Sequence, residues 1–181
     1  MIYDVDIAKL ELSCVLNIQG APADVVSLLS SRGISLPEKP NTAALARGMA
    51  IYWVGPTQWI LRAPEALEEQ LLQELQSDPS NGNTSVVDIS DTLQFFSVTG
   101  RDADDVLSVC CPLDIHRTVF PANAVTYTEI VSTKALLLRI PDGYEFAVDR
   151  SYADFANDSM HRILGTTQPV NHAGRPSPQI S

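Results

Sequence analysis

The chain has 181 residues, of which 45% are hydrophobic, and its 22 acidic and 12 basic side chains give a formal net charge of −10. This hydrophobic content can fill a sizeable core, so the composition excludes an intrinsically disordered chain. The acidic balance argues against nucleic-acid binding, because an acidic surface repels phosphate backbones.

The N-terminus and the cysteines indicate a cytoplasmic protein. The chain begins Met-Ile-Tyr-Asp-Val-Asp, which lacks the basic and apolar regions of a secretory signal, and no apolar run approaches the ~20 residues that span a bilayer. The three cysteines are Cys14, Cys110 and Cys111. A sparse, odd set with an adjacent pair is not a disulfide framework, so we expect a reducing compartment.

The first part of the chain predicts strands, a helix, a hairpin and a second helix. Apolar alternation predicts strands at residues 5–12 and 14–18, and helical spacing predicts a helix at 23–31 that ends at Gly33. A loop at 36–42 precedes a predicted hairpin, with strands 49–54 and 59–62 around a Gly-Pro turn, and an amphipathic helix at 65–75.

The second part repeats this plan after a polar linker at residues 77–84. We predict strands at 86–89, 94–98, 125–131, 135–140 and 145–148, and helices at 102–109 and 151–164. Ser151 is the predicted cap of the last helix, and Asp142-Gly143 is the strongest hairpin turn. Residues 166–181 are rich in Pro and polar side chains, so we expect a flexible tail that the fold does not require.

An internal repeat organises these elements. Residues 16–26 and 96–106 share a Gly, an Ala-Asp pair and a Val at a constant spacing, which aligns Gly20 with Gly100. The predicted class is therefore α+β, with two βαββα halves, residues 1–76 and 85–165, in one domain of residues 1–165.

The residues that could carry chemistry do not form a recognisable site. Neither glycine turn has a phosphate-binding fingerprint, the histidines at 116, 161 and 172 are scattered, and adjacent Cys110 and Cys111 cannot chelate as a spaced pair does. No Gly-x-Ser-x-Gly elbow is present. We therefore predict no catalytic, cofactor-binding or metal-binding residues. Trp53 and Trp59 flank the hairpin turn, and they are candidates for core packing, ligand stacking or a protein interface.

An ordered set of motifs resembles one family. Residues 53–61 are similar to a Trp-Leu-Gly-Pro-Asp-Glu-Trp-Leu motif, and residues 87–107 follow a Val-Asp-Val-Ser…Ser-Gly…Asp-Val-Leu pattern. The Cys-Pro-Leu-Asp-Ile-His segment at 111–116 and Phe120-Pro121 come next, and residues 150–155 match an Arg-Ser-Phe-Ala-Asp-Tyr motif. In this order they resemble the gamma subunit of heterotetrameric sarcosine oxidase, over about residues 15–164.

The resemblance implies a fold and a set of partners. The family is distantly similar to the folate-binding domain of the glycine-cleavage aminomethyltransferase and of a tRNA-modifying GTPase, which implies a folate-binding-domain-like unit. The aminomethyltransferase has an acidic catalytic pair in a hairpin, whereas the matching residues 131–135 here contain no carboxylate. The resemblance further implies alpha, beta and delta partner subunits that hold FAD, FMN, NAD and tetrahydrofolate, with direct contact to alpha.

The resulting interpretation is a non-catalytic gamma subunit of a complex that oxidatively demethylates sarcosine, or a related N-methyl amino acid, to glycine and a one-carbon unit. At least one of Trp53 and Trp59 would then anchor alpha while the other fills the core. Two alternatives stay open: a stand-alone folate or one-carbon binding module, and an assembly scaffold outside methylamine metabolism. The sequence does not distinguish among N-methyl substrates, or an oxidase from a dehydrogenase.

Overall fold

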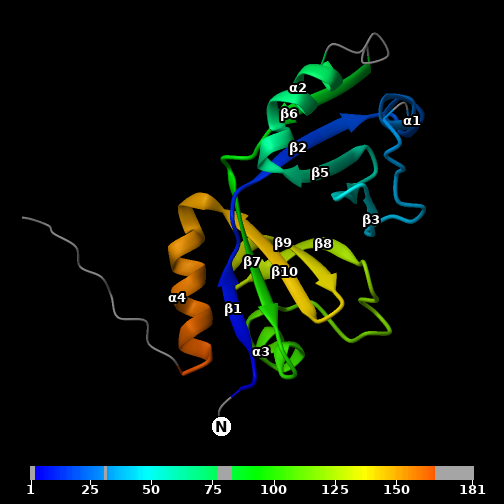
Figure 1. The fold of residues 1–181 in the computed structure, drawn as a ribbon. Coiled ribbons are helices and arrows are strands. Elements are labelled where there is room, and N and C mark those ends of the chain that lie inside the picture. The colour runs from blue at the N-terminus through cyan, green and yellow to red at the C-terminus, as the bar shows by residue number, and fades with distance from the viewer. Residues whose placement is uncertain (1–2, 31, 77–82, 166–181) are drawn as a thin grey trace, which may run out of the picture.

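Two antiparallel five-stranded sheets form the centre of the protein (Figure 1). The computed structural model describes residues 3–30, 32–76 and 83–165. The first sheet has the order β3-β4-β5-β2-β6, and the second has the order β1-β7-β10-β9-β8. The strands of the first sheet are β2 (Ser13–Gly20), β3 (Ala43–Ala46), β4 (Met49–Gly55), β5 (Gln58–Pro64) and β6 (Thr84–Asp88). Those of the second are β1 (Asp6–Lys9), β7 (Leu93–Thr99), β8 (Val125–Ile130), β9 (Thr133–Ile140) and β10 (Gly143–Asp149).

Helices cover the outer face of each sheet. On the first sheet lie α1 (Pro22–Ser30) and α2 (Glu68–Gln76), which follows the short 3-10 helix η1 (Glu65–Leu67). On the second lie α3 (Ala103–Cys110) and α4 (Ala153–Ile163), which follows η3 (Arg150–Tyr152). Alternate side chains of each strand point to opposite faces, so each sheet packs against its helices on one side and against the other sheet on the other.

Three buried clusters correspond to these interfaces. One joins the first sheet to its helices and includes Trp59 and Leu28, and another joins the second sheet to its helices and includes Phe146 and Met160. The third lies between the sheets, and its buried members are Val15, Tyr52, Ile60, Phe95, Val125, Leu136, Leu138 and Ala147. The molecule therefore has four layers, ordered helices, sheet, sheet, helices.

The predicted α+β fold with two repeated halves is confirmed, but each half has the order ββαβββα, with two more strands than the predicted βαββα. The two sheets have matching strand orders, so β2, β3, β4 and β5 correspond to β7, β8, β9 and β10. The first strand of each half joins the other half's sheet: β1 pairs with β7, and β6 pairs with β2. The halves are therefore interlocked by an exchange of strands.

Three details differ from the predicted elements. The edge strand β3 was not predicted, since Ala43–Ala46 is short and lacks branched residues. The first strand is shorter than predicted, Asp6–Lys9. The Ser151 cap is wrong: Asp149 accepts hydrogen bonds from the Ser151 backbone N and Oγ at 2.9 and 2.5 Å, which lower the pKa of Asp149.

Parts of the sequence-based predictions fall outside the described residues. These are residue 31 at the end of the first predicted helix, residues 77–82 of the linker and the tail at 166–181. Across the described ranges, no helix has the length and apolar character needed to cross a membrane.

Candidate functional site

Trp53 and Trp59 stack on one another but differ in exposure. Their ring centroids are 5.8 Å apart with planes at 29°. Trp59 is fully buried in the cluster between the first sheet and its helices. Trp53 is half-buried at its edge and donates from Nε1 to the Gly55 carbonyl at 2.7 Å. Of the two, only Trp53 has surface that a second protein could contact.

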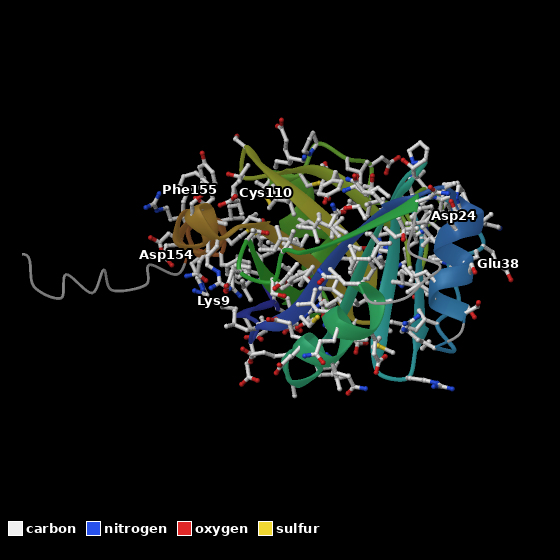
Figure 2. The ribbon with its side chains drawn as sticks, turned by 90° about the horizontal axis from the view of Figure 1, so that it is seen from above. Lys9, Asp24, Glu38, Cys110, Asp154 and Phe155 are labelled. Carbon is white, nitrogen blue, oxygen red and sulfur yellow. The ribbon has the colours of Figure 1, made fainter. Side chains whose placement is uncertain are left out.

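Two more exposed aromatic residues lie near the start of the last helix. Tyr152 and Phe155 are 53% and 51% exposed, and Figure 2 shows Phe155 projecting from α4 at the end of the molecule opposite α1. Residues three apart share a helix face, so the pair forms an aromatic patch. Sequence reasoning did not select it, although the i, i+3 spacing of two aromatic residues is a usable signal.

Cys14 and Cys110 are poor nucleophiles. Burial is the main cause that raises the pKa of Cys14 and of Cys110 from 9.0 to about 11. Cys110 Sγ lies 3.6 Å from Met160 Sδ, at the packed end of α3. The thiolate is the reactive form of cysteine, and the raised pKa values keep these two thiols protonated near neutral pH. They therefore act as small apolar packing residues.

The other candidate chemistry stays dispersed. His116 Nδ1 lies 2.8 Å from the Thr118 hydroxyl oxygen in an exposed loop. Within the residues that the structure covers, no group of three or more His, Cys, Asp and Glu side chains could hold a metal ion. Gly100 has a φ of 123°, and a Cβ there would lie 2.3 Å from the Asp4 carbonyl oxygen. The close approach of the Asp4 backbone therefore explains why this position is a glycine.

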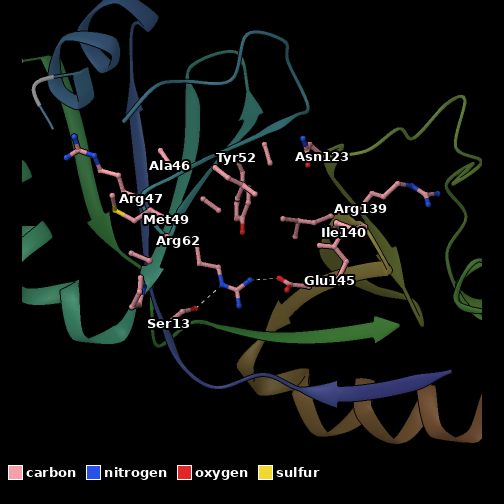
Figure 3. Close-up of a pocket in the computed structure, with 18 of the residues that line it drawn as sticks. Ser13, Ala46, Arg47, Met49, Tyr52, Arg62, Asn123, Arg139, Ile140 and Glu145 are labelled. Atoms are coloured by element: carbon pink, nitrogen blue, oxygen red, sulfur yellow. Dashed lines mark hydrogen bonds and ion pairs between the residues drawn. The ribbon is translucent and has the colours of Figure 1, made fainter. Parts of the chain in front are cut away.

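A cavity of about 690 Å³ opens between the two sheets (Figure 3). Strands β3, β4 and β5 form one wall, and β9, β10 and the segment before β8 form the other. Direct sheet-to-sheet bonds fix one side: Ala43 N donates to the Asn123 carbonyl at 2.7 Å, and Val125 N donates to the Asn41 carbonyl at 2.9 Å. Both asparagines have positive φ, 56° at Asn41 and 62° at Asn123, which Asn adopts more readily than most residues.

The floor of the cavity is polar. Arg62 of β5 forms an ion pair with Glu145 of β10, and its Nε donates to Ser13 Oγ at 3.1 Å. The guanidinium also lies over the Phe95 ring, 4.0 Å from the centroid. Tyr52 lies beside the pair; burial raises its phenol pKa, and nearby Arg62 opposes that rise. These contacts hold Arg62 in one orientation.

Two other arginines line the cavity with their stems only. Figure 3 shows the guanidinium groups of Arg47 and Arg139 turned away from its centre. Arg139 is 5% exposed, donates to the Phe120 carbonyl at 2.6 Å and also contacts Tyr144. Arg62 and Glu145 are therefore the charged groups that the cavity presents to its interior.

The remaining walls are apolar, with few hydrogen-bonding groups. The apolar side chains that line it come from both sheets and include Leu45, Met49, Ala50, Leu138 and Ile140. An apolar cavity with a few convergent polar groups has the general character of a small-molecule site. Sequence reasoning missed this site, because Arg62 and Glu145 are 83 positions apart.

Comparison with solved structures shows the same fold class. A chain of the heterotetrameric sarcosine oxidase from Corynebacterium sp. U-96, solved in complex with pyrrole 2-carboxylate, matches with a TM-score of 0.77 and 22% identity, over 92% of this chain and 87% of that chain. The glycine cleavage system aminomethyltransferase T from Bartonella henselae matches with a TM-score of 0.64 and 13% identity, over 88% of this chain and 46% of that chain. The folate-binding-domain-like architecture predicted by resemblance is confirmed.

Sequence comparison identifies the family. The model of the sarcosine oxidase gamma subunit family matches residues 19–162. Sarcosine oxidase gamma subunits from Arthrobacter sp and Corynebacterium sp. (strain P-1) are each 27% identical over 141 residues, covering 76% of this chain and 66% of the relative. The chain thus spans just under two thirds of the length of these curated relatives. It belongs to the sarcosine oxidase gamma subunit family.

Proposed function

We propose that this chain is a non-catalytic subunit of a sarcosine oxidase-like heterotetramer in the cytoplasm. The complex oxidatively demethylates sarcosine, or a related N-methyl amino acid, to glycine and a one-carbon unit. Its alpha, beta and delta subunits hold FAD, FMN, NAD and tetrahydrofolate, and this chain contributes interface area and stability.

The observation that carries the proposal is the family match over residues 19–162, which includes elements of both sheets and all four α-helices. The chemistry of the described residues supports a non-catalytic role. The cysteines Cys14 and Cys110 have raised pKa values of about 11, so neither supplies a thiolate near neutral pH. The cysteines are also free, as in proteins of reducing compartments.

The exposed aromatic residues support direct contact with the alpha subunit. Tyr and Trp are enriched among the few residues that dominate interface energy. Trp53 reaches the surface on the first sheet, and Tyr152 and Phe155 do so on α4. These two regions are the candidate contact surfaces.

Co-expression with and without this chain tests the proposal. Complexes of the alpha, beta and delta subunits are purified with and without it, and sarcosine turnover is measured per bound flavin. We expect omission to lower the yield and melting temperature of the complex while turnover per flavin stays within about twofold. A stoichiometric flavin spectrum in the isolated chain, or a complete loss of turnover in an otherwise intact complex, would contradict it.

A further inference from the structure

We propose that the cavity between the two sheets binds a small, uncharged organic molecule with a largely apolar body and an amide-like edge, that is, an N–H donor next to a carbonyl acceptor. This proposal does not depend on the role of the chain in an oxidase complex. It rests on an asymmetry between the two halves and on the hydrogen-bonding groups left at the cavity floor.

The repeat shows that the fold does not require a polar floor. Arg62 pairs with Val15 in the first sheet as Ala147 pairs with Phe95 in the second. By the same register, Glu145 occupies the position that Ile60 occupies in the first sheet. Both equivalents, Ala147 and Ile60, are buried in the apolar cluster between the sheets. Arg62 and Glu145 therefore occupy positions whose equivalents in the other half are apolar core residues.

The register also explains the space. Ala50 pairs with Arg62 on β5, and its equivalent in the second sheet is Leu136, which pairs with Ala147. Leu136 is 1% exposed and fills the core, whereas Ala50 leaves room and lines the cavity. Ser13 lines the same cavity where the other half has Leu93. Smaller and more polar side chains at equivalent positions thus open one end of the inter-sheet layer.

The charge of the floor favours an uncharged ligand. Arg62 and Glu145 neutralise one another, with side-chain exposures of 18% and 22%. A ligand carboxylate would be attracted by Arg62 but repelled by Glu145. A ligand cation would be attracted by Glu145 but repelled by Arg62. Moving an uncompensated charge into a largely apolar cavity is costly. A neutral molecule avoids both penalties.

The unused hydrogen-bonding capacity defines the edge of that molecule. Arg62 commits Nε to Ser13 and Nη1 to Glu145, and its guanidinium also interacts with the Tyr52 hydroxyl, which still leaves N–H groups of its five. Glu145 accepts through Oε2, and its Oε1 has no hydrogen bond from the described residues. The floor therefore presents a donor beside an acceptor. A ligand carbonyl accepts from Arg62 while the neighbouring ligand N–H donates to Glu145.

The size of the cavity suits a drug-sized molecule. Its volume of about 690 Å³ lies within the ~300–1,000 Å³ typical of ligand pockets. Apolar walls formed by Leu45, Met49 and Leu138 favour an aromatic or aliphatic body.

Two isosteric probes test the proposal directly. 2-Quinolinone has an amide edge, and coumarin replaces its N–H with a ring oxygen. Each is titrated into the full ¹⁵N-labelled chain, and amide chemical shifts are followed. We expect saturable shifts at β4, β5, β9 and β10, with 2-quinolinone binding about tenfold more tightly than coumarin, because a hydrogen bond to a carboxylate is a strong one. Equal affinities, or shifts confined to other elements, would overturn the proposal.

Variants separate the cavity from a general apolar surface. Ala50→Trp blocks the cavity and should abolish the shifts, whereas Ala66→Trp, at an exposed position on η1, should leave them intact. Ala50→Leu copies the other half, so it keeps the assay usable if the larger side chain disrupts folding, and it should weaken binding. Arg62→Leu with Glu145→Leu should bring the two probes to equal affinity. Retained discrimination in this double variant, or unchanged binding in Ala50→Leu, would also overturn the proposal.

Discussion

Arg62 on β5 and Glu145 on β10 form an ion pair that joins the two sheets across 83 positions of sequence. Each side chain keeps about a fifth of its surface exposed, 18% for Arg62 and 22% for Glu145. The pair is therefore neither a surface salt bridge nor a fully buried one, and its contribution depends on what replaces it.

Removing one partner should destabilise the protein more than removing both. Glu145→Leu leaves the Arg62 guanidinium half-buried without its carboxylate, at a cost of about 1–3 kcal/mol. Replacing both residues by Leu restores the apolar character of the equivalent positions, so we expect the double variant to recover most of this loss. Urea denaturation of the single and double variants measures the difference. Additive losses in the double variant would contradict this account.

Gly143 should tolerate no side chain, because it lies against β7. Its φ is 150°, and a Cβ would lie 2.2 Å from the Val98 carbonyl oxygen. Gly143→Ala must displace backbone within the second sheet, so we expect a loss of at least about 2 kcal/mol in thermal or urea unfolding. Gly48 is the matched control, since its φ is also positive, 77°, with nothing within 4 Å of the built Cβ. Gly48→Ala should cost about 1 kcal/mol; similar losses at both sites would rule out the steric explanation.

The two tryptophans should respond differently to truncation. Trp59 is fully buried, so Trp59→Ala should cost about 3–5 kcal/mol and leave little folded free chain. Trp53 is half-buried, so Trp53→Ala should remain folded by circular dichroism. If Trp53 anchors the alpha subunit, this variant should also co-purify less efficiently with alpha. Unimpaired co-purification would show that Trp53 does not anchor alpha. Tyr152 and Phe155, which are also exposed, would then be tested in the same way.

Alkaline pH should weaken the fold partly through Cys14. Burial first, and the nearby carboxylates Glu68 and Asp88 next, raise the pKa of this thiol from 9.0 to about 11. Between these values the unfolded chain releases a proton that the folded chain retains, so the free energy of unfolding falls as pH rises. Below about pH 9 this contribution is fully present. Melting temperatures from pH 8 to 10.5 should fall more steeply in the parent than in Cys14→Ala, and parallel slopes would exclude this cause.

Most of the fold could be predicted from the repeated local sequence pattern. Gly20 and Gly100 sit at equivalent turns between a strand and a helix, so alignment of two short segments was enough to reveal two related halves. The exchange of β1 and β6 was not accessible in the same way, because a strand's own residues specify its faces and not its neighbour. The edge strand β3 escaped because Ala43–Ala46 has little strand propensity, and its pairing with β4 determines its conformation.

The cavity was harder to predict than the fold. Arg62 and Glu145 each look like an ordinary polar residue of an alternating strand, and only the packing of two sheets brings them together. The sequence offset between equivalent positions of the two halves also changes along the chain. The equivalents of Arg62 and Glu145 can therefore be found only by comparing strand registers. The signal is a polar residue in one half whose equivalent in the other half is a core residue. This equivalence can be recognised only from the strand registers of the structure.

The exchanged strand β1 also sets an order of events during synthesis. Its register pairs Asp6 with Thr99 and Lys9 with Phe96, so its partner strand is made long after β1 itself. At typical elongation rates of ~5–20 residues per second, β1 waits roughly 5–20 s for β7 to be made. Throughout that interval the nascent chain carries a strand whose native partner has not yet been made. The strand is short and has acidic Asp6 and basic Lys9 at its ends, which is a composition that discourages pairing with other chains.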